Sequence, residues 1–305
     1  MKQKIKLILL IGSGRSGSTL MDMLVNENPN IMGVGEISNW NNKVFNEYCA
    51  CGDIVKSCPF WSEVIRKVGW SEKDFQKYKE YQYEFNAPKR DSVFKIKDYT
   101  EKSGFNDFIS KSNEIFNAIS EVSNKQILFD SSKSPQRAFN LSKSDLFDVK
   151  FIYLMRDPRG VVWSFKKSFK KNQKAGLQKD MKGTSLQKAL YSWLAVNSRA
   201  FSALKSTSFP SLFVKYENFC ANPNQEINRI LEFVLGEKPK TEINLSESMQ
   251  TESHVIAGNR LRMNKDIIIK PDFAWKKNLN FFQKAFIYSL TFPLLNKFKS
   301  SPSAR

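Results

Sequence analysis

The chain has 305 residues, of which 41% are hydrophobic and 13% aromatic, which argues against a disordered protein and allows a large core. Its 48 lysines and arginines against 30 aspartates and glutamates give a net charge of +18. This charge favours anionic partners, which include nucleic acid, acidic lipid, nucleotides and sulfated or acidic glycans.

The first predicted element is a buried strand over residues 4–11. The stretch KIKLILLI is apolar, rich in β-forming residues and too short to span a membrane. The lysines at its start are typical of a signal peptide, but the apolar part runs directly into a glycine loop without a small-residue cleavage site. We therefore predict a parallel strand and a cytoplasmic protein.

The loop GSGRSGST at residues 12–19 matches two phosphate-binding motifs. It fits G-x-G-x-x-G, and it fits the P-loop G-x-x-x-x-G-K-[ST] except that Ser18 stands where the lysine belongs. A helix-spaced stretch follows over residues 19–26. Strand, loop and helix in this order direct backbone N–H groups and a helix dipole at an anion. The predicted binding residues are Gly14, Arg15, Ser16, Gly17, Ser18, Thr19 and Leu20. The alternative is an ordinary turn that needs its glycines only for geometry.

Further strand-like runs alternate with helical stretches along the rest of the chain. They lie at residues 30–34, 126–130, 149–155 and 211–215. This alternation predicts one α/β domain over residues 1–305, with a P-loop-type three-layer fold and a central parallel sheet.

Residues 61–123 interrupt this alternation. The segment is polar and mostly helical in period, and it carries an aromatic stripe of Phe75, Tyr78, Tyr81 and Phe85. We favour packing of this stripe against the sheet domain. The alternative is a helical cap inserted over the site of the acceptor.

Three of the four cysteines cluster in the stretch CACGDIVKSCPFW, as Cys49, Cys51 and Cys58, while Cys220 is remote. A zinc site needs four ligands, and the only histidine, His254, is far away in the sequence. We predict a structural loop with reduced thiols. A disulfide within the cluster comes second, and a metal site third.

Polar residues follow two of the later strands. In FIYLMRDPRGVVWSFKKS, Arg156 ends a strand, Pro158 begins a helix, and Ser164 lies about two turns into it. Ligands of open α/β sheets bind at such strand ends, where a guanidinium and a hydroxyl together hold a phosphate. The alternative is a surface ion pair between Arg156 and Asp157 or Asp148.

The stretch ILFDSSKSPQR leaves the nature of the ligand open. Asp130 is placed like a magnesium ligand of a P-loop kinase, but the loop lacks the lysine that such a kinase uses. Glu36 is placed like the ribose-binding acid of a dinucleotide site. That interpretation leaves Arg156, Ser164 and Lys133 without a role.

Four stretches together resemble a known family. RSGST, DSSKSPQR, RDPRGVVWS and VKYENF are similar to motifs of the sulfotransferases that use 3′-phosphoadenosine 5′-phosphosulfate (PAPS), over roughly residues 4–275. The arginine in the loop resembles the bacterial branch and the tyrosylprotein and carbohydrate sulfotransferases. HVIAGNRLR and the cysteine stretch also look like the bacterial branch.

The resemblance implies a set of cofactor contacts. The loop would hold the 5′-phosphosulfate, Arg156 and Ser164 the 3′-phosphate, and Tyr216 the nucleotide. Three residues would close over the cofactor: Gly258, Asn259 and Arg262. No metal is required, because a sulfuryl group carries less charge than the γ-phosphoryl of ATP.

The resemblance also implies three catalytic residues. Glu36 would act as the general base on the acceptor hydroxyl, since His254 does not match that role. Arg15 would neutralise the bridging oxygen, and Lys133 would stabilise the transition state. The alternatives are an ion-paired or helix-capping glutamate at position 36 and a solvated lysine at position 133.

The remaining expectations concern partners. The basic run at residues 164–182 is either solvated surface or a track for an acidic acceptor such as a saccharide, and we expect no nucleic-acid partner. Residues 279–298 predict a docked amphipathic helix without a transmembrane span, or a peripheral membrane contact. Residues 299–305 predict a flexible tail. Two other functions stay open, an ATP-dependent small-molecule kinase and a non-catalytic basic nucleotide- or anion-binding module.

Overall fold

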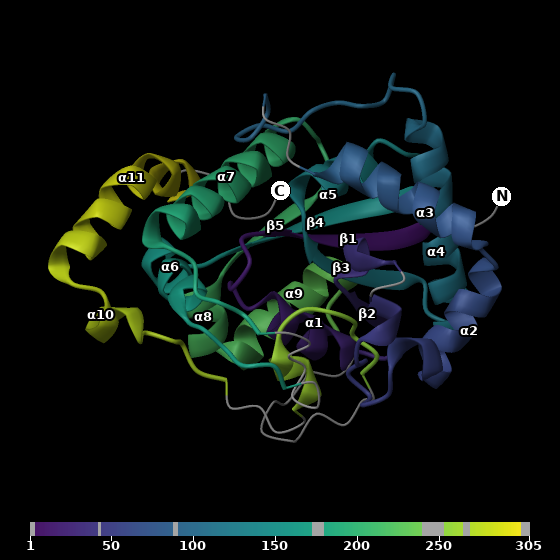
Figure 1. The fold of residues 1–305 in the computed structure, drawn as a ribbon, viewed down its shortest axis with the longest axis horizontal. Helices are drawn as coiled ribbons and strands as arrows, with labels where there is room; N and C mark the ends of the chain where they lie inside the picture. The colour runs from purple at the N-terminus through teal and green to yellow at the C-terminus, as the bar shows by residue number, and fades with distance from the viewer. Residues whose placement is uncertain are drawn as a thin grey trace.

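The computed structural model describes residues 4–41, 44–87, 91–172, 180–239, 253–264 and 269–299 (Figure 1). A parallel sheet of five strands runs through its centre in the order β2-β3-β1-β4-β5. The strands are β1 (Ile5–Gly12), β2 (Ile31–Gly35), β3 (Ile127–Lys133), β4 (Phe147–Met155) and β5 (Ser211–Lys215). The predicted α/β fold with a central parallel sheet is therefore confirmed, although β3 continues three residues beyond its predicted end.

The apolar run that predicted the first strand lies in the middle of the sheet. β1 pairs with β3 on one side and with β4 on the other, so both of its faces are covered. Leu7 and Leu9 pack into the core on one face of the sheet, while Ile8 and Leu10 pack into the core on the other. A strand with two covered faces is apolar at nearly every position, which explains the unbroken hydrophobic pattern.

Helices form a layer on each face of the sheet (Figure 1). One core cluster joins the sheet to α1 (Ser18–Asn26), α8 (Tyr216–Ala221) and α9 (Pro223–Leu235). The opposite cluster includes α2 (Pro59–Val68), α3 (Glu72–Tyr81), α4 (Phe105–Ser123), α5 (Pro135–Ser142) and α7 (Leu186–Lys205). A smaller cluster joins α6 (Pro158–Lys166) to α10 (Trp275–Asn278) and α11 (Phe281–Lys299).

Residues 61–123 contain α2, α3, a π-helical turn at Gln82–Asn86, and α4. Tyr78 and Phe85 of the aromatic stripe are buried, and Phe75 and Tyr81 pack against the same core cluster, which includes sheet residues. The favoured interpretation of the stripe as a packing surface is therefore confirmed. A cap over the acceptor site stays a prediction.

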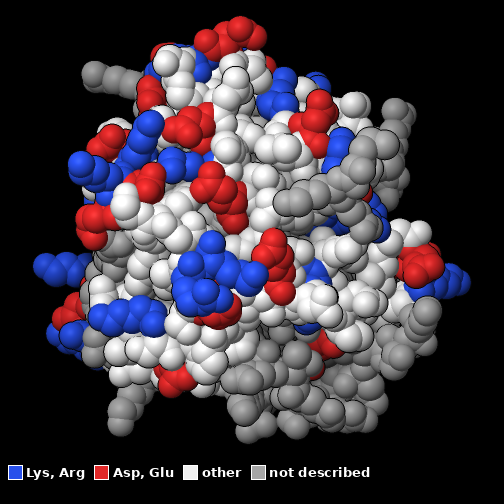
Figure 2. Space-filling view, turned by 90° about the vertical axis from the view of Figure 1, so that its right-hand side faces the viewer, with Lys and Arg blue, Asp and Glu red and all other residues white. Residues whose placement is uncertain are grey.

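Helices α2, α3 and α4 form the side of the molecule that Figure 2 shows. Among the described residues on this face, basic and acidic side chains lie interspersed. The exposed ion pairs of these helices include Lys67–Glu121 and Lys77–Asp107. Exposed pairs of this kind are worth about 0–1 kcal/mol each. The positive net charge is thus partly balanced on this face.

The prediction of an amphipathic C-terminal helix is wrong in one respect. α11 docks through buried Ile287 and Phe298, but large apolar side chains also point to solvent: Phe281, Phe282, Phe286, Tyr288, Leu290 and Phe292. Apolar residues thus lie all around the helix, and only a narrow stripe is covered. Among the described helices, none is long and apolar enough to cross a membrane. Lys299 ends α11, and the rest of the predicted tail, residues 300–305, lies outside the described residues.

A buried carboxylate ties α1 to the end of β2. Asp22 is fully buried, and its Oδ2 accepts hydrogen bonds from the N–H of Gly35 at 3.0 Å and from the hydroxyl of Ser131 at 2.5 Å. Its Oδ1 has no partner among the described residues. Burial raises the pKa of Asp22 to about 7, and the nearby Asp130 adds to this, although the Ser131 hydrogen bond opposes it.

The raised pKa predicts a specific pH dependence of stability. Between about pH 4 and pH 7 the folded chain keeps a proton on Asp22 that the unfolded chain releases, so a rise in pH favours unfolding. We expect this group to lower the free energy of unfolding by about 1.4 kcal/mol per pH unit across that window. Urea denaturation of wild type and Asp22→Asn measures the effect, since the variant lacks it. Parallel pH profiles of the two proteins would contradict the raised pKa.

Candidate functional site

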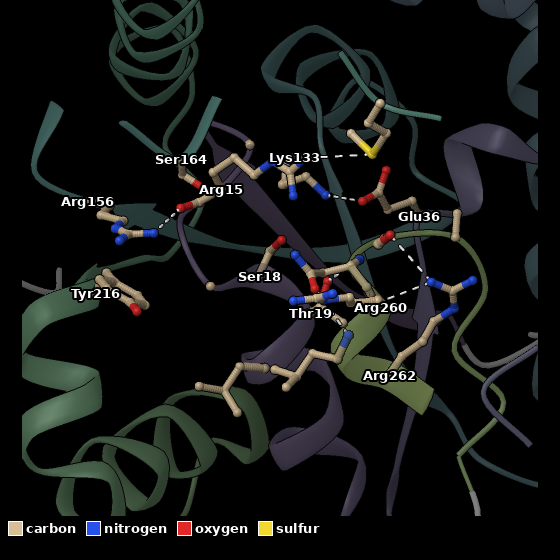
Figure 3. Close-up of a pocket in the computed structure, with 18 of the residues that line it drawn as sticks. Arg15, Ser18, Thr19, Glu36, Lys133, Arg156, Ser164, Tyr216, Arg260 and Arg262 are labelled. Atoms are coloured by element: carbon tan, nitrogen blue, oxygen red, sulfur yellow. Dashed lines mark hydrogen bonds and ion pairs between the residues drawn. The ribbon is translucent and has the colours of Figure 1, made fainter. Parts of the chain in front are cut away.

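The carboxyl ends of the five strands meet at one edge of the sheet, where each contributes a polar residue. Lys133 ends β3, while Glu36, Arg156 and Tyr216 directly follow β2, β4 and β5, and Arg15 lies in the loop after β1. Ligands of open α/β sheets bind at this edge. All five residues line a single cavity of about 640 Å³, a size typical of small-molecule sites (Figure 3).

The glycine loop needs its glycines for two close approaches. Gly12 has φ +142°, and a Cβ there would lie 2.2 Å from the carbonyl oxygen of Leu154. Gly17 has φ +91°, and a Cβ there would lie 2.8 Å from the ring of Tyr216. α1 begins at the next residue, Ser18. The loop thus brings the positive end of the helix dipole to the cavity wall.

Nearly all of the predicted site residues line this cavity. They are Gly14, Arg15, Gly17, Ser18, Thr19, Leu20, Glu36, Lys133, Arg156, Ser164, Tyr216, Gly258, Asn259 and Arg262. The exception is Ser16, which is buried in the loop. Its hydroxyl has no hydrogen-bond partner among the described residues. A buried hydroxyl without a partner at an anion-binding loop fits a ligand that supplies one.

Arg156 connects the glycine loop to the segment that contains Asp272. Its Nη1 donates to the carbonyl oxygen of Arg15 at 2.8 Å, and its Nη2 lies 3.2 Å from both a carbonyl and a carboxylate oxygen of Asp272. The guanidinium carbon is 4.3 Å from the centroid of the Tyr216 ring. Burial raises the pKa of Tyr216 to about 12, so its hydroxyl is neutral at physiological pH.

Two alternative interpretations of the strand ends are wrong. Arg156 is largely buried and pairs with Asp272, rather than forming a surface pair with either aspartate that the sequence suggested. Asp130 is also buried, lies 3.2 Å from Arg137 in an ion pair, and does not line the cavity. The kinase alternative therefore loses its magnesium ligand, because this carboxylate is committed to the core.

Glu36 and Lys133 form an ion pair in the cavity wall. Lys133 Nζ lies 2.5 Å from Glu36 Oε1, and the two side chains are only 14% and 23% exposed. Asn39 donates weakly to the other carboxylate oxygen, at 3.4 Å. Glu36 is thus ion-paired, as one alternative expected, and it also faces the cavity as a base must.

The backbone around the cavity is conformationally unusual. Among the described residues, four that are not glycine have positive φ, and Arg15 (66°), Lys133 (63°) and Ala257 (56°) line this cavity. Such a backbone conformation costs free energy for residues that carry a Cβ and is found most often at functional sites. Here it fixes the direction of two of the predicted catalytic cations.

The segment of residues 253–264 covers α1 and the end of β2. The N–H of Glu36 donates to the carbonyl oxygen of Ile256, and the N–H of Asn259 donates to Thr19 Oγ1, both at 3.0 Å. A Cβ on Gly258 would lie 2.9 Å from Thr19 Oγ1. The segment therefore packs onto the start of α1 beside the glycine loop, while closure of Gly258, Asn259 and Arg262 over a cofactor stays a prediction.

Several cavity residues were missed in the sequence. Arg260 lies over the ring of Phe169 at 5.2 Å, and Arg15 lies 6.0 Å from the same ring. Phe169 and Met181 both line the cavity, and two backbone hydrogen bonds of 2.8 Å join them. The predicted basic track, residues 164–182, therefore reaches the cavity near its beginning and near its end. Arg260 lies in the sequence between the predicted site residues Asn259 and Arg262, so it could have been predicted with them. Glu47 also lines the cavity, but no motif near it in the sequence indicates a binding site. Residues 173–179 of the track lie outside the described residues.

The cavity is electropositive. Arg15, Lys133, Arg156, Arg260 and Arg262 line it, against the carboxylates of Glu36 and Glu47. Burial lowers the pKa of both Arg15 and Arg262, which means that their charges are incompletely compensated. An anionic ligand would supply the missing compensation.

The charged groups are also divided in space. Arg156, Ser164 and Tyr216 lie on one side of Ser18, while Lys133 and Glu36 lie on the other (Figure 3). The arrangement fits an elongated ligand with an anionic group near each end.

Comparisons with known proteins identify the family and the fold. A family model described as the sulfotransferase family matches residues 8–236. The sulfotransferase domain from the Synechococcus PCC 7002 olefin synthase is similar at 17% identity and a TM-score of 0.50, covering 95% of this chain and 96% of that one. The sulfotransferase domain from the curacin biosynthetic pathway is similar at 14% identity and a TM-score of 0.51, covering 95% and 98%. These two structures share the fold. A search of the curated proteins found no match.

Proposed function

Because the chain belongs to the sulfotransferase family, we propose that it transfers a sulfuryl group from PAPS to a hydroxyl of an acceptor. One observation carries the proposal. A single cavity at the strand ends combines a glycine loop, two separated groups of cations and a carboxylate. A nucleotide with an anion at each end would use both groups of cations, which a mononucleotide monophosphate would not.

The positions of the side chains support the proposed cofactor contacts. The N–H groups of residues 14–20 would hold the 5′-phosphate, and Arg156 with Ser164 would hold the 3′-phosphate by charge-assisted hydrogen bonds. The neutral hydroxyl and the ring of Tyr216 would lie along the nucleotide. The second wall would come from Gly258, Asn259 and Arg262.

The proposed chemistry uses three side chains. When bound, PAPS supplies the sulfuryl group, whose sulfur gains a bond to the acceptor oxygen and loses its bond to the 5′-phosphate of 3′,5′-ADP. Glu36 accepts the proton of the acceptor hydroxyl. Arg15 and Lys133 place positive charge where negative charge develops, and the transfer needs no metal bridge.

The acceptor class rests on charge alone. The net charge of +18 and the basic residues that line the cavity support a saccharide or another acidic hydroxyl compound, and no nucleic-acid partner is proposed. A cytoplasmic location stays a prediction. A peripheral membrane contact through the exposed apolar side chains of α11 also stays a prediction.

Calorimetric titration tests the nucleotide site directly. Without added magnesium, we expect 3′,5′-ADP to bind about 100-fold or more tightly than 5′-AMP, a difference of about 2.7 kcal/mol. ATP and NAD serve as controls because each lacks the 3′-phosphate. Equal affinity for 3′,5′-ADP and 5′-AMP would overturn the proposed cofactor. Tight 3′,5′-ADP binding without turnover of PAPS on any of a panel of phenols and saccharides would favour a non-catalytic module.

A further inference from the structure

Three cysteines from one short stretch converge with the distant His254, whose segment, residues 253–264, contributes residues to the cavity lining. The sulfurs of Cys49, Cys51 and Cys58 and a ring nitrogen of His254 all lie within 4.8 Å of one another. The Nδ1 of His254 is 3.3 Å from Cys58 Sγ and 3.9 Å from Cys49 Sγ, and Cys51 Sγ is 3.6 Å from Cys58 Sγ. The sequence argument that only three ligands are close is therefore wrong in space.

These distances fit a tetrahedral metal site. With Zn–S bonds of about 2.3 Å and Zn–N bonds of about 2.0–2.1 Å, a tetrahedron has S···S edges of about 3.8 Å and S···N edges of about 3.6 Å. The separations of 3.3, 3.6 and 3.9 Å lie within a few tenths of an ångström of those values, and no two of the four ligand atoms are more than 4.8 Å apart. All four cysteines are free thiols in the structure, so the cluster is not crosslinked by a disulfide.

The surrounding structure holds three of the four candidate ligands in place. The backbone carbonyl oxygen of Cys49 accepts a turn hydrogen bond from the N–H of Gly52 at 3.0 Å, and Cys58 lies directly before α2. The helix dipole at this terminus favours a thiolate. The imidazole stacks on Phe60 with the rings 13° from parallel, and Trp61 Nε1 donates to the carbonyl oxygen of His254 at 2.6 Å. The histidine ring is therefore oriented by contacts outside the cluster.

We propose that Cys49, Cys51, Cys58 and His254 bind one structural Zn²⁺ ion through three sulfurs and Nδ1. Tetrahedral sulfur and nitrogen ligands favour zinc, and a set of four protein ligands leaves no open position for catalysis. Binding converts three thiols to thiolates and releases their protons to solvent, while the imidazole binds in its neutral form. The site carries no part of the sulfuryl transfer.

The position of the site gives the ion a structural role. His254 belongs to the 253–264 segment, whereas the three cysteines belong to the region before and at the start of α2. The same segment bonds to Glu36 through Ile256 and to Thr19 through Asn259. A zinc ion would therefore clamp the cover of the cavity to the sheet domain.

Metal analysis of the intact protein tests the proposal. After purification under reducing conditions without a chelator, we expect one zinc ion per chain. Removal of the zinc and titration with Co²⁺ should give the absorption bands of tetrahedral cobalt together with thiolate-to-cobalt charge transfer. Protein that contains no zinc and binds no Co²⁺ while reduced would overturn the proposal, as would a native disulfide within the cluster.

Variants of the proposed ligands are compared with a variant of an unrelated cysteine. Cys51→Ser and His254→Gln are expected to weaken Co²⁺ binding at least about 100-fold, since loss of even an outer-sphere partner costs about 10–100-fold. Cys220→Ser removes the remote buried thiol and should leave Co²⁺ binding unchanged. Equal Co²⁺ affinity in all three variants would refute the assignment. Circular dichroism confirms that each variant is folded.

Hydrogen exchange tests the clamp separately. Removal of zinc from wild type should increase exchange in residues 253–264 more than in the central strands. Unchanged exchange in this segment would refute the clamp and leave only a bound ion. Neither readout depends on sulfuryl transfer, so the zinc proposal and the proposed function fail independently.

Discussion

Replacement of Glu36 by glutamine is expected to lower kcat by about 10²–10⁴-fold, the usual contribution of a general base. Glutamine keeps the size of the side chain and its place next to Lys133 but cannot accept the acceptor proton. The affinity for 3′,5′-ADP should change less than about 3-fold, because the carboxylate lies on the side of Ser18 opposite Arg156. Steady-state kinetics and calorimetry measure the two quantities.

Two controls make the Glu36 result interpretable. Glu63→Gln removes an exposed carboxylate on α2 that pairs with Arg66 and should leave kcat unchanged. An acceptor with an unusually acidic hydroxyl depends less on a general base. Glu36→Gln should therefore lower kcat less for such an acceptor than for an ordinary alcohol. Loss of nucleotide affinity with little loss of kcat would instead identify Glu36 as a positioning residue for Lys133.

Replacement of Arg156 by alanine is expected to weaken 3′,5′-ADP binding by about 100-fold, since a hydrogen bond to a charged group is worth about 1.5–3 kcal/mol. The affinity for 5′-AMP should fall much less, because this ligand lacks the 3′-phosphate. The comparison of the two ligands is essential, since Arg156 also donates to the loop carbonyl of Arg15. Calorimetry with both ligands on both proteins isolates the 3′-phosphate contact.

Arg159 provides the matched control for Arg156. It carries the same charge on the adjacent helix, pairs with Asp157 at 2.6 Å, and does not line the cavity. Arg159→Gln should therefore leave the preference for 3′,5′-ADP over 5′-AMP unchanged. If Arg156→Ala weakened both ligands equally, Arg156 would support the loop rather than bind the 3′-phosphate.

The sheet and most of the cavity could be predicted because their signals are local. A run such as KIKLILLI shows a buried strand within eight residues, and parallel strands bring their carboxyl ends to one edge. Arg156 and Lys133 could thus be assigned to one site from their position after a strand. Their backbone conformations and ion pairs could not be predicted, because they depend on neighbours from other strands.

Contacts between residues far apart in the sequence could not be predicted from local patterns. The pair Cys49 and His254 is 205 residues apart, and no periodic pattern connects them. Asp130 had the right spacing for a metal ligand, but its partner Arg137 holds it in the core. Likewise, the sequence did not show which apolar residues of α11 would be buried. Only a narrow stripe of the helix docks, and the outer face is apolar where a polar face was expected.

Each of the five strand ends contributes a residue to the cavity, and this links ligand binding to folding. No single supersecondary unit contains the site, so a partly folded chain that lacks any one strand lacks part of the cavity. Ligand binding and global folding are therefore linked equilibria. A nucleotide that binds only the native state stabilises the entire domain by about 2.7 kcal/mol at a concentration 100 times its Kd. An increase in the thermal midpoint of unfolding would then show which nucleotide binds at the strand ends, even with no acceptor present.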